Sequence, residues 1–305
     1  MLRYTIKRFL QGLVVLAGVS VVIFAISRLG GDPVSLMVGP EVQAAEREAL
    51  RQQWGLDGPL HAQYLRFLVR AARGDFGKSI LAGVPATALV LERLPATMEL
   101  AVFALAFAAA LGIPLGIVSG LRHNTIVDYV GMAFTMLGQS LPSFWLGILL
   151  IMIVGLKLRA LPISGRGSFL HLVMPGVTLG MALVAAFARL TRTSMLEVLS
   201  ADYIRTARAK GLGWRAVTLR HELRNALIPL VTVMGMSFAG LLSGAVVTEQ
   251  VFAWPGIGRL AISSIYQRDF PVIQAVVLFV SVVVVVVNFA VDILYTFLDP
   301  RIRYR

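Results

Sequence analysis

FPVIQAVVLFVSVVVVVVNFAV, residues 270–291, contains no charged side chain. A helix needs about 20 predominantly apolar residues to cross the hydrocarbon core of a bilayer, which is about 30 Å thick. Uncharged runs of comparable length also occupy 10–27, 100–121, 129–156, 172–188 and 226–248. The runs have the length of helices and not the roughly 10-residue alternation of outer-membrane strands. The sequence therefore predicts an all-α polytopic membrane protein with six transmembrane helices.

The composition agrees with this class. Hydrophobic residues make up 57% of the 305 residues and charged residues 14%, against about 45–50% and about 25% in ordinary globular domains. The first apolar run exceeds the roughly 7–15 apolar residues of a signal peptide, so an uncleaved first span is expected. With no cysteine in the chain, a disulfide or thiolate site is excluded. The net charge of +12 does not by itself indicate nucleic acid, and no nucleic-acid partner is expected.

The distribution of Lys and Arg predicts the orientation. Fifteen of these residues fall on the face that holds both termini and the loop between the fourth and fifth spans, and five fall in the two short loops of the other face. Because short cytoplasmic loops carry the excess of positive charge, both termini are expected in the cytoplasm. The resulting division is 1–27 for the N-terminus and first span, 28–99 for an extracytoplasmic helical segment, and 100–305 for a five-helix core.

The segment 28–99 is expected to contain two short helices, each started by a proline and stopped by a glycine. The first begins near Pro40. The second covers 59–73 and ends before Gly74. One stripe of the second helix carries its apolar residues: Leu60, Tyr64, Phe67, Leu68 and Ala71.

Glycines four residues apart recur within the spans, and such spacing lets helix backbones approach closely in lipid. The sets are Gly112, Gly116 and Gly120; Gly176 and Gly180; Gly240 and Gly244. They indicate a packed bundle and do not identify a function.

Catalytic and nucleotide-binding motifs fail on inspection, so no enzyme activity is expected. ARGDFGKS at 72–79 has Ala72 where a phosphate-binding loop needs its first glycine, and HELRN at 221–225 has Asn225 where a zinc motif needs its second histidine. The acidic residues of the spans lie near their ends: Glu99, Asp128, Glu249 and Asp292. Span centres without carboxylates argue against a secondary, ion-driven transporter.

A basic stretch lies between the fourth and fifth spans, at about 193–225. Ser194 and Glu197 fit a capping box that starts a helix, and Gly211 is placed to stop it in a left-handed turn. One side of this helix is expected to carry Leu196, Leu199, Tyr203 and Ala207, and the other Asp202, Arg205 and Arg208. A second short helix should begin at Gly213-Trp214 and lead to Pro229. The stretch is predicted to be a stiff helix-turn-helix, with a solvated basic loop as the alternative.

DYIRTARAKGL at 202–212, followed by HELRNALIP at 221–229, resembles the cytoplasmic coupling loop, or EAA loop, of ABC importer permeases of the peptide/nickel family. The resemblance spans the chain. Its other motifs are GDP at 31–33, DFGKS at 75–79, RLPATMEL at 93–100, SLPSFWLG at 140–147, LPISG at 161–165, TRTSMLEVL at 191–199, TEQVFAWPGIG at 248–258, RDFPVIQ at 268–274, VDILY at 291–295 and DPRIRYR at 299–305. One departure is that Arg205-Thr206-Ala207 stands where the loop's Glu-Ala-Ala is usual.

The resemblance implies a type I ABC importer permease fold, in a bacterial or archaeal cytoplasmic (inner) membrane. It implies four kinds of partner: a second homologous permease subunit, one or two ATP-binding cassette ATPase subunits, an extracytoplasmic substrate-binding protein, and the lipid bilayer. ATP and Mg would be bound by the ATPases, with no cofactor in this chain. The substrate-binding protein would face 28–99 and TEQVFAWPGIG.

The resemblance also assigns the contact with the ATPases to the coupling loop, through Glu197, Asp202, Tyr203, Arg205, Thr206, Ala207, Arg208, Lys210, Gly211 and Leu212. The expected substrates are di- and oligopeptides. Nickel chelates, glutathione or another small solute are alternatives within the family. A secondary transporter and a membrane scaffold without a pore are alternatives of other classes.

Overall fold

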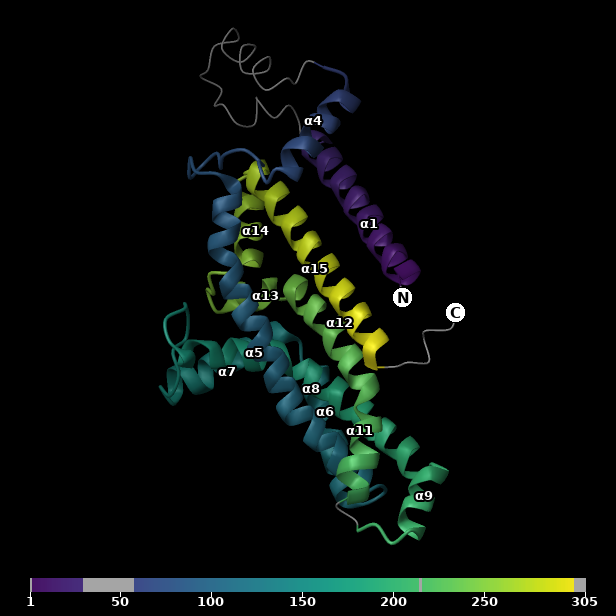
Figure 1. The fold of residues 1–305 in the computed structure, drawn as a ribbon. Coiled ribbons are helices and arrows are strands. Elements are labelled where there is room, and N and C mark those ends of the chain that lie inside the picture. Colours follow the sequence, from purple (N-terminus) through teal and green to yellow (C-terminus); the bar gives the residue numbers. More distant parts are fainter. Residues whose placement is uncertain (1, 30–57, 214–215, 299–305) are drawn as a thin grey trace. The chain divides into compact units, whose positions relative to one another are not determined.

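The computed structural model describes residues 2–29, 58–213 and 216–298. Within these ranges the chain is helical and forms no strand beyond one isolated bridge between Lys78 and Pro85. The helices (Figure 1) are α1 Leu2–Leu29, α4 Leu60–Ala72, α5 Ala86–Leu121, α6 Ile126–Ser140, α7 Ser143–Leu150, the π-helix η1 Ile151–Lys157, α8 Phe169–Leu199, α9 Asp202–Ala209, the π-helix η2 Val217–Glu222, α11 Leu223–Ala226, α12 Ile228–Gly244, α13 Val246–Val251, α14 Ile257–Tyr266 and α15 Phe270–Leu298. The all-α prediction is confirmed.

Each of the six predicted spans coincides with apolar helix. Four helices, α1, α5, α8 and α15, are long and apolar enough to cross a membrane, and α12 is a shorter apolar helix. The remaining span, predicted as the single run 129–156, is broken into α6 and the continuous pair α7–η1, which meet at 98°. Pro142 precedes α7 and holds Leu141 in extended backbone, so the helix cannot continue through this point.

The helix of the second predicted span begins at Ala86 and not near residue 100. It therefore includes residues that the sequence analysis placed in the segment 28–99. The charged residues Glu92, Arg93 and Glu99 precede the predicted apolar run, and the helix continues through them without a break.

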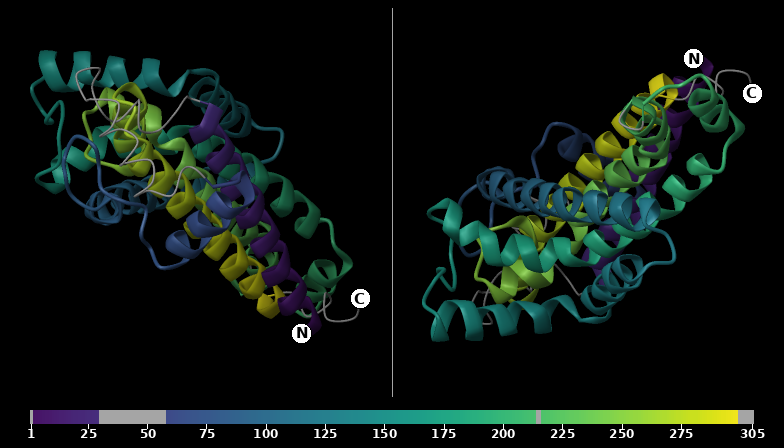
Figure 2. Two further views of the ribbon diagram at one scale, coloured as in Figure 1. Left: turned by 90° about the horizontal axis from the view of Figure 1, so that it is seen from above. Right: turned by 90° about the horizontal axis from the view of Figure 1, so that it is seen from below.

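By its contacts the chain forms two compact units, Met1–Pro95 with Gly256–Val286 and Ala96–Pro255 with Val287–Arg305. The core of the first unit joins the start of α5 to α14 and α15 through Ala86, Val90, Ile257, Val272, Ala275 and Val276. In the same unit α1 runs beside α15 (Figure 2), where a Cβ added to Gly12 would lie 2.7 Å from Val285 Cγ1.

The helix predicted at 59–73 is present as α4, which ends before Gly74 at a φ of 73°. It packs on α1 through Tyr64, whose ring meets Phe24 edge-on and whose hydroxyl lies 2.8 Å from Ser20 Oγ. Leu60 does not join this contact and is exposed. The helix predicted after Pro40 lies outside the described residues.

The loop after α4 is fixed by two carboxylates. Arg70 Nε donates to Asp75 Oδ2 at 3.0 Å, and this hydrogen bond lowers the pKa of Asp75. Ser79 Oγ donates to Asp269 Oδ2 at 2.5 Å, and both residues are buried. The turn that carries DFGKS is therefore tied to the turn that precedes α15.

In the second unit α5 and α8 are in backbone contact at their glycines. A Cβ on Gly112 would lie 2.8 Å from Val184 O, one on Gly116 would lie 2.5 Å from Ala188 O, and one on Gly120 would lie 2.7 Å from Met195 Cβ. In the same way, a Cβ added to Gly180 of α8 would lie 2.6 Å from Ala104 O of α5. Close packing by these two sets of glycines is as predicted, whereas a Cβ on Gly240 would meet nothing within 4 Å.

TEQVFAWPGIG, expected to face a binding protein, places its residues up to Trp254 mainly in the core of this unit. Trp254 is fully buried, and its Nε1 donates to Ala96 O at 2.8 Å. The carboxylate of Glu249 is also fully buried and accepts a hydrogen bond of 2.7 Å from Thr97 Oγ1. This part of the motif anchors α13 to α5 and presents little surface to a partner.

Replacing Gly116 by alanine should lower the free energy of unfolding by about 1–3 kcal/mol, because the new methyl group overlaps backbone that cannot move aside. The matched control is Gly240→Ala, which adds the same methyl group where space is open and should be neutral or slightly stabilising. Thermal unfolding of the purified protein in detergent measures both. Equal melting temperatures for the two variants would contradict the packing described.

Candidate functional site

The predicted helix start at Ser194 is wrong. Residues 194–197 belong to the last turns of α8, which continues to Leu199. Ser194 and Met195 are buried there, and no glycine or proline occurs between Phe187 and Leu199. The long span helix therefore extends directly to the basic stretch, and α9 follows after Ser200 and Ala201 (Figure 1).

α9 packs through one apolar face. Ile204 is fully buried, and with Ala207 it contacts Val217 of η2 and Val198 of α8. The sequence analysis placed Tyr203 on the same side of the helix as Ala207, but Ala207 is buried and Tyr203 is 45% exposed. Because one residue rotates a helix by about 100°, the buried face is centred on Ile204.

Two further features hold α9 in place. Asn225 Nδ2 of α11 donates to the Tyr203 hydroxyl at 3.2 Å, which joins the first helix of the stretch to the last. Gly211 has a φ of 77°, so the helix ends in the left-handed turn that was predicted. The next turn opens at Gly213, whose carbonyl accepts from Ala216 N at 2.9 Å. The stretch is a helix-turn-helix, as expected.

The outer face of the stretch is polar and exposed. Arg205 Nη1 lies 3.7 Å from Asp202 Oδ1, and both side chains are almost fully exposed, so this ion pair adds little stability. Glu197, Thr206, Lys210 and Leu212 are also exposed, and of Arg208 only the place on α9 is described. Thr206 Oγ1 donates to Asp202 O at 3.0 Å within the helix.

The predicted contact residues are divided between the last turn of α8, α9 and the turn that follows α9. The sequence analysis missed three residues that hold these elements together: Ile204, Val217 and Asn225. Ile204 is the only large aliphatic residue of α9, and that signal was available. The contacts of Val217 and Asn225 depend on how the second helix folds back, which no local pattern reveals.

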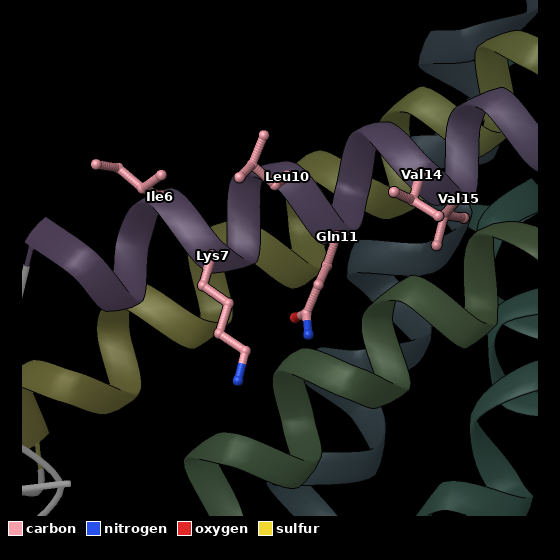
Figure 3. A pocket seen from close by; sticks show the side chains of 6 residues that line it. All are labelled: Ile6, Lys7, Leu10, Gln11, Val14 and Val15. Carbon is pink, nitrogen blue, oxygen red and sulfur yellow. The ribbon is translucent and has the colours of Figure 1, made fainter.

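Other parts of the described chain are weaker candidates for a functional site. No three His, Asp or Glu side chains within the described ranges come together in a way that could hold a metal ion. A hollow on α1 is lined by 6 residues, all of that one helix: Ile6, Lys7, Leu10, Gln11, Val14 and Val15 (Figure 3). Lys7 and Gln11 point to the same side of the helix. A hollow on one helix surface does not outline a substrate path.

Comparison with known proteins identifies the family. The model of the binding-protein-dependent transport system inner membrane component matches residues 112–304, and the model of its N-terminal part matches residues 1–101. The chain belongs to this family of permeases. Glutathione transport system permease protein GsiC from Salmonella paratyphi A and from Escherichia coli strain K12 are each 43% identical to the chain over 306 residues, covering 100% of both sequences.

A solved structure of similar fold agrees with this assignment. The inward-facing MetNI methionine ABC transporter matches with a TM-score of 0.59 over 69% of this chain and 96% of that chain, at 19% identity. The protein is thus a transmembrane permease subunit of an ABC importer, as the sequence motifs predicted. Such a permease is embedded in the bacterial inner membrane and works with ATPase and substrate-binding components; it is not itself the catalyst.

Replacing Ile204 by alanine should loosen the permease's helix-turn-helix, because removing a fully buried isoleucine side chain costs about 2–5 kcal/mol. Amide hydrogen exchange of residues 202–209 should become faster by at least about tenfold. Arg205→Ala, at the next position but exposed, should leave exchange nearly unchanged. Equal exchange in the two variants would show that α9 does not depend on this core.

Proposed function

We propose that the chain forms half of a translocation path for short peptides, with glutathione as the first substrate to test. The observation that carries this proposal is the 43% identity with glutathione permeases over the full length of both chains. Glutathione is a tripeptide with a γ-linked glutamate, so it lies within the di- and oligopeptide class expected from the sequence. Nickel chelates and other small solutes are the alternatives within the family.

The helix-turn-helix at 193–225 is proposed as the contact with the ATPase subunits. Ile204, Ala207 and Val217 pack against one another within the stretch, so its apolar face is already buried and its polar face is left for a partner. Its packing around Ile204 supports the role, since a well-packed element transmits a displacement that a flexible loop would absorb. The residues proposed to carry the contact are those of the outer face and the turn: Glu197, Asp202, Tyr203, Arg205, Thr206, Arg208, Lys210, Gly211 and Leu212, with Ala207 packing beneath them.

The proposed assembly contains a second homologous permease subunit, one or two ATPase subunits that bind ATP and Mg, and a substrate-binding protein outside the cell. Both termini and 193–225 would lie in the cytoplasm, as the Lys and Arg distribution indicates. The segment 28–99 would contribute to the outer face, where the binding protein arrives.

The substrate is tested by uptake in a host that lacks its own glutathione and peptide importers and expresses the complete assembly. Labelled glutathione should accumulate, and an excess of unlabelled glutathione should compete better than a dipeptide or a nickel chelate. Accumulation should stop when the ATPase is inactivated. Preferred uptake of dipeptide would assign the broader peptide class instead. Uptake that survives ATPase inactivation and collapses with the proton gradient would identify a secondary transporter.

Gly211→Pro tests the coupling role. Proline fixes φ near −65°, which is incompatible with the φ of 77° at this position, so the end of α9 must change direction. The assembled complex should still bind ATP but lose the stimulation of hydrolysis by loaded binding protein. Gly213→Ala, in the same linker but without a positive φ, is the control and should retain stimulation. Normal stimulated hydrolysis and transport in Gly211→Pro would refute the role.

A further inference from the structure

In one ion pair of the second unit the carboxylate is buried, whereas the arginine side chain is 23% exposed. Asp128, in the first turn of α6, is 1% exposed. Arg192 of α8 donates to both of its carboxylate oxygens, from Nε to Oδ1 at 2.7 Å and from Nη2 to Oδ2 at 2.7 Å. Asn124 N adds a hydrogen bond of 3.1 Å to Oδ2. The carboxylate is therefore held in a two-pronged geometry that has little freedom to slide.

The same turn of α8 is held from a second side by α5. A Cβ on Gly116 would lie 3.1 Å from the backbone N of Arg192, and one on Gly120 would lie 3.5 Å from its carbonyl O. At Arg192, α5 thus contacts the backbone of α8, and α6 contacts the Arg192 side chain. At this level α8 is therefore held by backbone contact with α5 and by the ion pair with α6.

This junction lies close to the helix proposed to contact the ATPase. From Arg192 the helix α8 continues without a break to Leu199, a distance of about 10 Å at 1.5 Å per residue. α9 begins at Asp202. A displacement of α9 would therefore reach Arg192 through the turn at Ser200 and Ala201 and then the last two turns of α8.

We propose that the Asp128–Arg192 pair is a positioning contact that passes movement of α9 from α8 to α6, and so toward the break at Leu141–Pro142. The inference rests on the proposed coupling role of α9. Separating the pair would leave the buried Asp128 carboxylate with only Asn124 N and the His123 ring beside it, which is unfavourable, so α6 follows α8.

The first test uses two variants, one that keeps the charge and one that keeps the shape. Arg192→Lys retains the cation but loses the two-pronged contact, and Asp128→Asn retains the shape but loses the charge. In the reconstituted complex, substrate transported per ATP hydrolysed should fall by about fivefold or more. Because this ratio is taken per ATP, a smaller amount of assembled complex does not change it.

The matched control is the pair of Glu99 and Arg166, which belongs to the same unit. Arg166 Nη2 lies 2.8 Å from Glu99 Oε2, but the two side chains are 41% and 40% exposed. Glu99→Gln should leave transport per ATP unchanged. An unchanged ratio in Arg192→Lys and Asp128→Asn, or an equal fall in Glu99→Gln, would overturn the proposal.

The second test restores the connection by other means, which is possible because the chain contains no cysteine. The double variant Asp128→Cys with Arg192→Cys should lose coupling. Bridging its two thiols with a flexible reducible cross-linker should recover coupling, and reduction should remove it again. Each single-cysteine variant, treated identically, controls for reaction elsewhere in the complex. A bridge that leaves coupling lost would show that α6 and α8 need to separate.

The outcomes distinguish this inference from the proposed function. If the wild-type complex shows no ATP-driven uptake, the proposed function fails first. If wild-type uptake requires ATP and Gly211→Pro abolishes stimulation, the coupling role stands. A normal ratio in Arg192→Lys then rejects the positioning contact alone.

Discussion

The second unit depends on glycines between α5 and α8, because their lack of a side chain lets the two backbones come into contact. A Cβ added to Gly112, Gly116 or Gly180 would lie too close to a carbonyl oxygen of the other helix to be tolerated. In lipid there is little hydrophobic force to hold helices together, so close contact and its dispersion energy must provide the association. The neighbouring elements build on this contact. α6 adds the Asp128–Arg192 pair to it, and α13 is anchored to α5 through Trp254 and Glu249.

The placement of the helix-turn-helix at 193–225 follows from the same arrangement. α8 is fixed to α5 up to Met195, and its last turns carry α9 with little intervening chain. Ile204 then fills the space between α8 and η2, and Asn225 reaches back to Tyr203. The permease thus presents, directly after one of its long span helices, a helical element with an exposed polar surface.

The sequence predicts the helical spans well because one physical rule governs them: apolar runs of sufficient length form helices in a bilayer. It predicts Gly211 for a comparably local reason, since a left-handed turn favours glycine. Its errors have causes of other kinds. Ser194 and Glu197 match the sequence pattern of a capping box whether they start a helix or lie inside one. The burial of Ser194 and Met195 shows that they lie inside α8. The sequence grouped Tyr203 with Ala207, whereas in α9 the residue buried together with Ala207 is Ile204. The pairing of Asp128 with Arg192 joins residues that are 64 apart in the chain, beyond any local pattern.

The length of α5 has a consequence for the membrane around it. With 36 residues the helix is about 54 Å long, whereas the hydrocarbon layer is about 30 Å thick. Full immersion would require an inclination well beyond the roughly 40° at which transmembrane helices are found. A substantial part of this rod therefore stands in the headgroup layer or in water, and Glu92, Arg93 and Glu99 mark the portion that needs no hydrophobic surroundings.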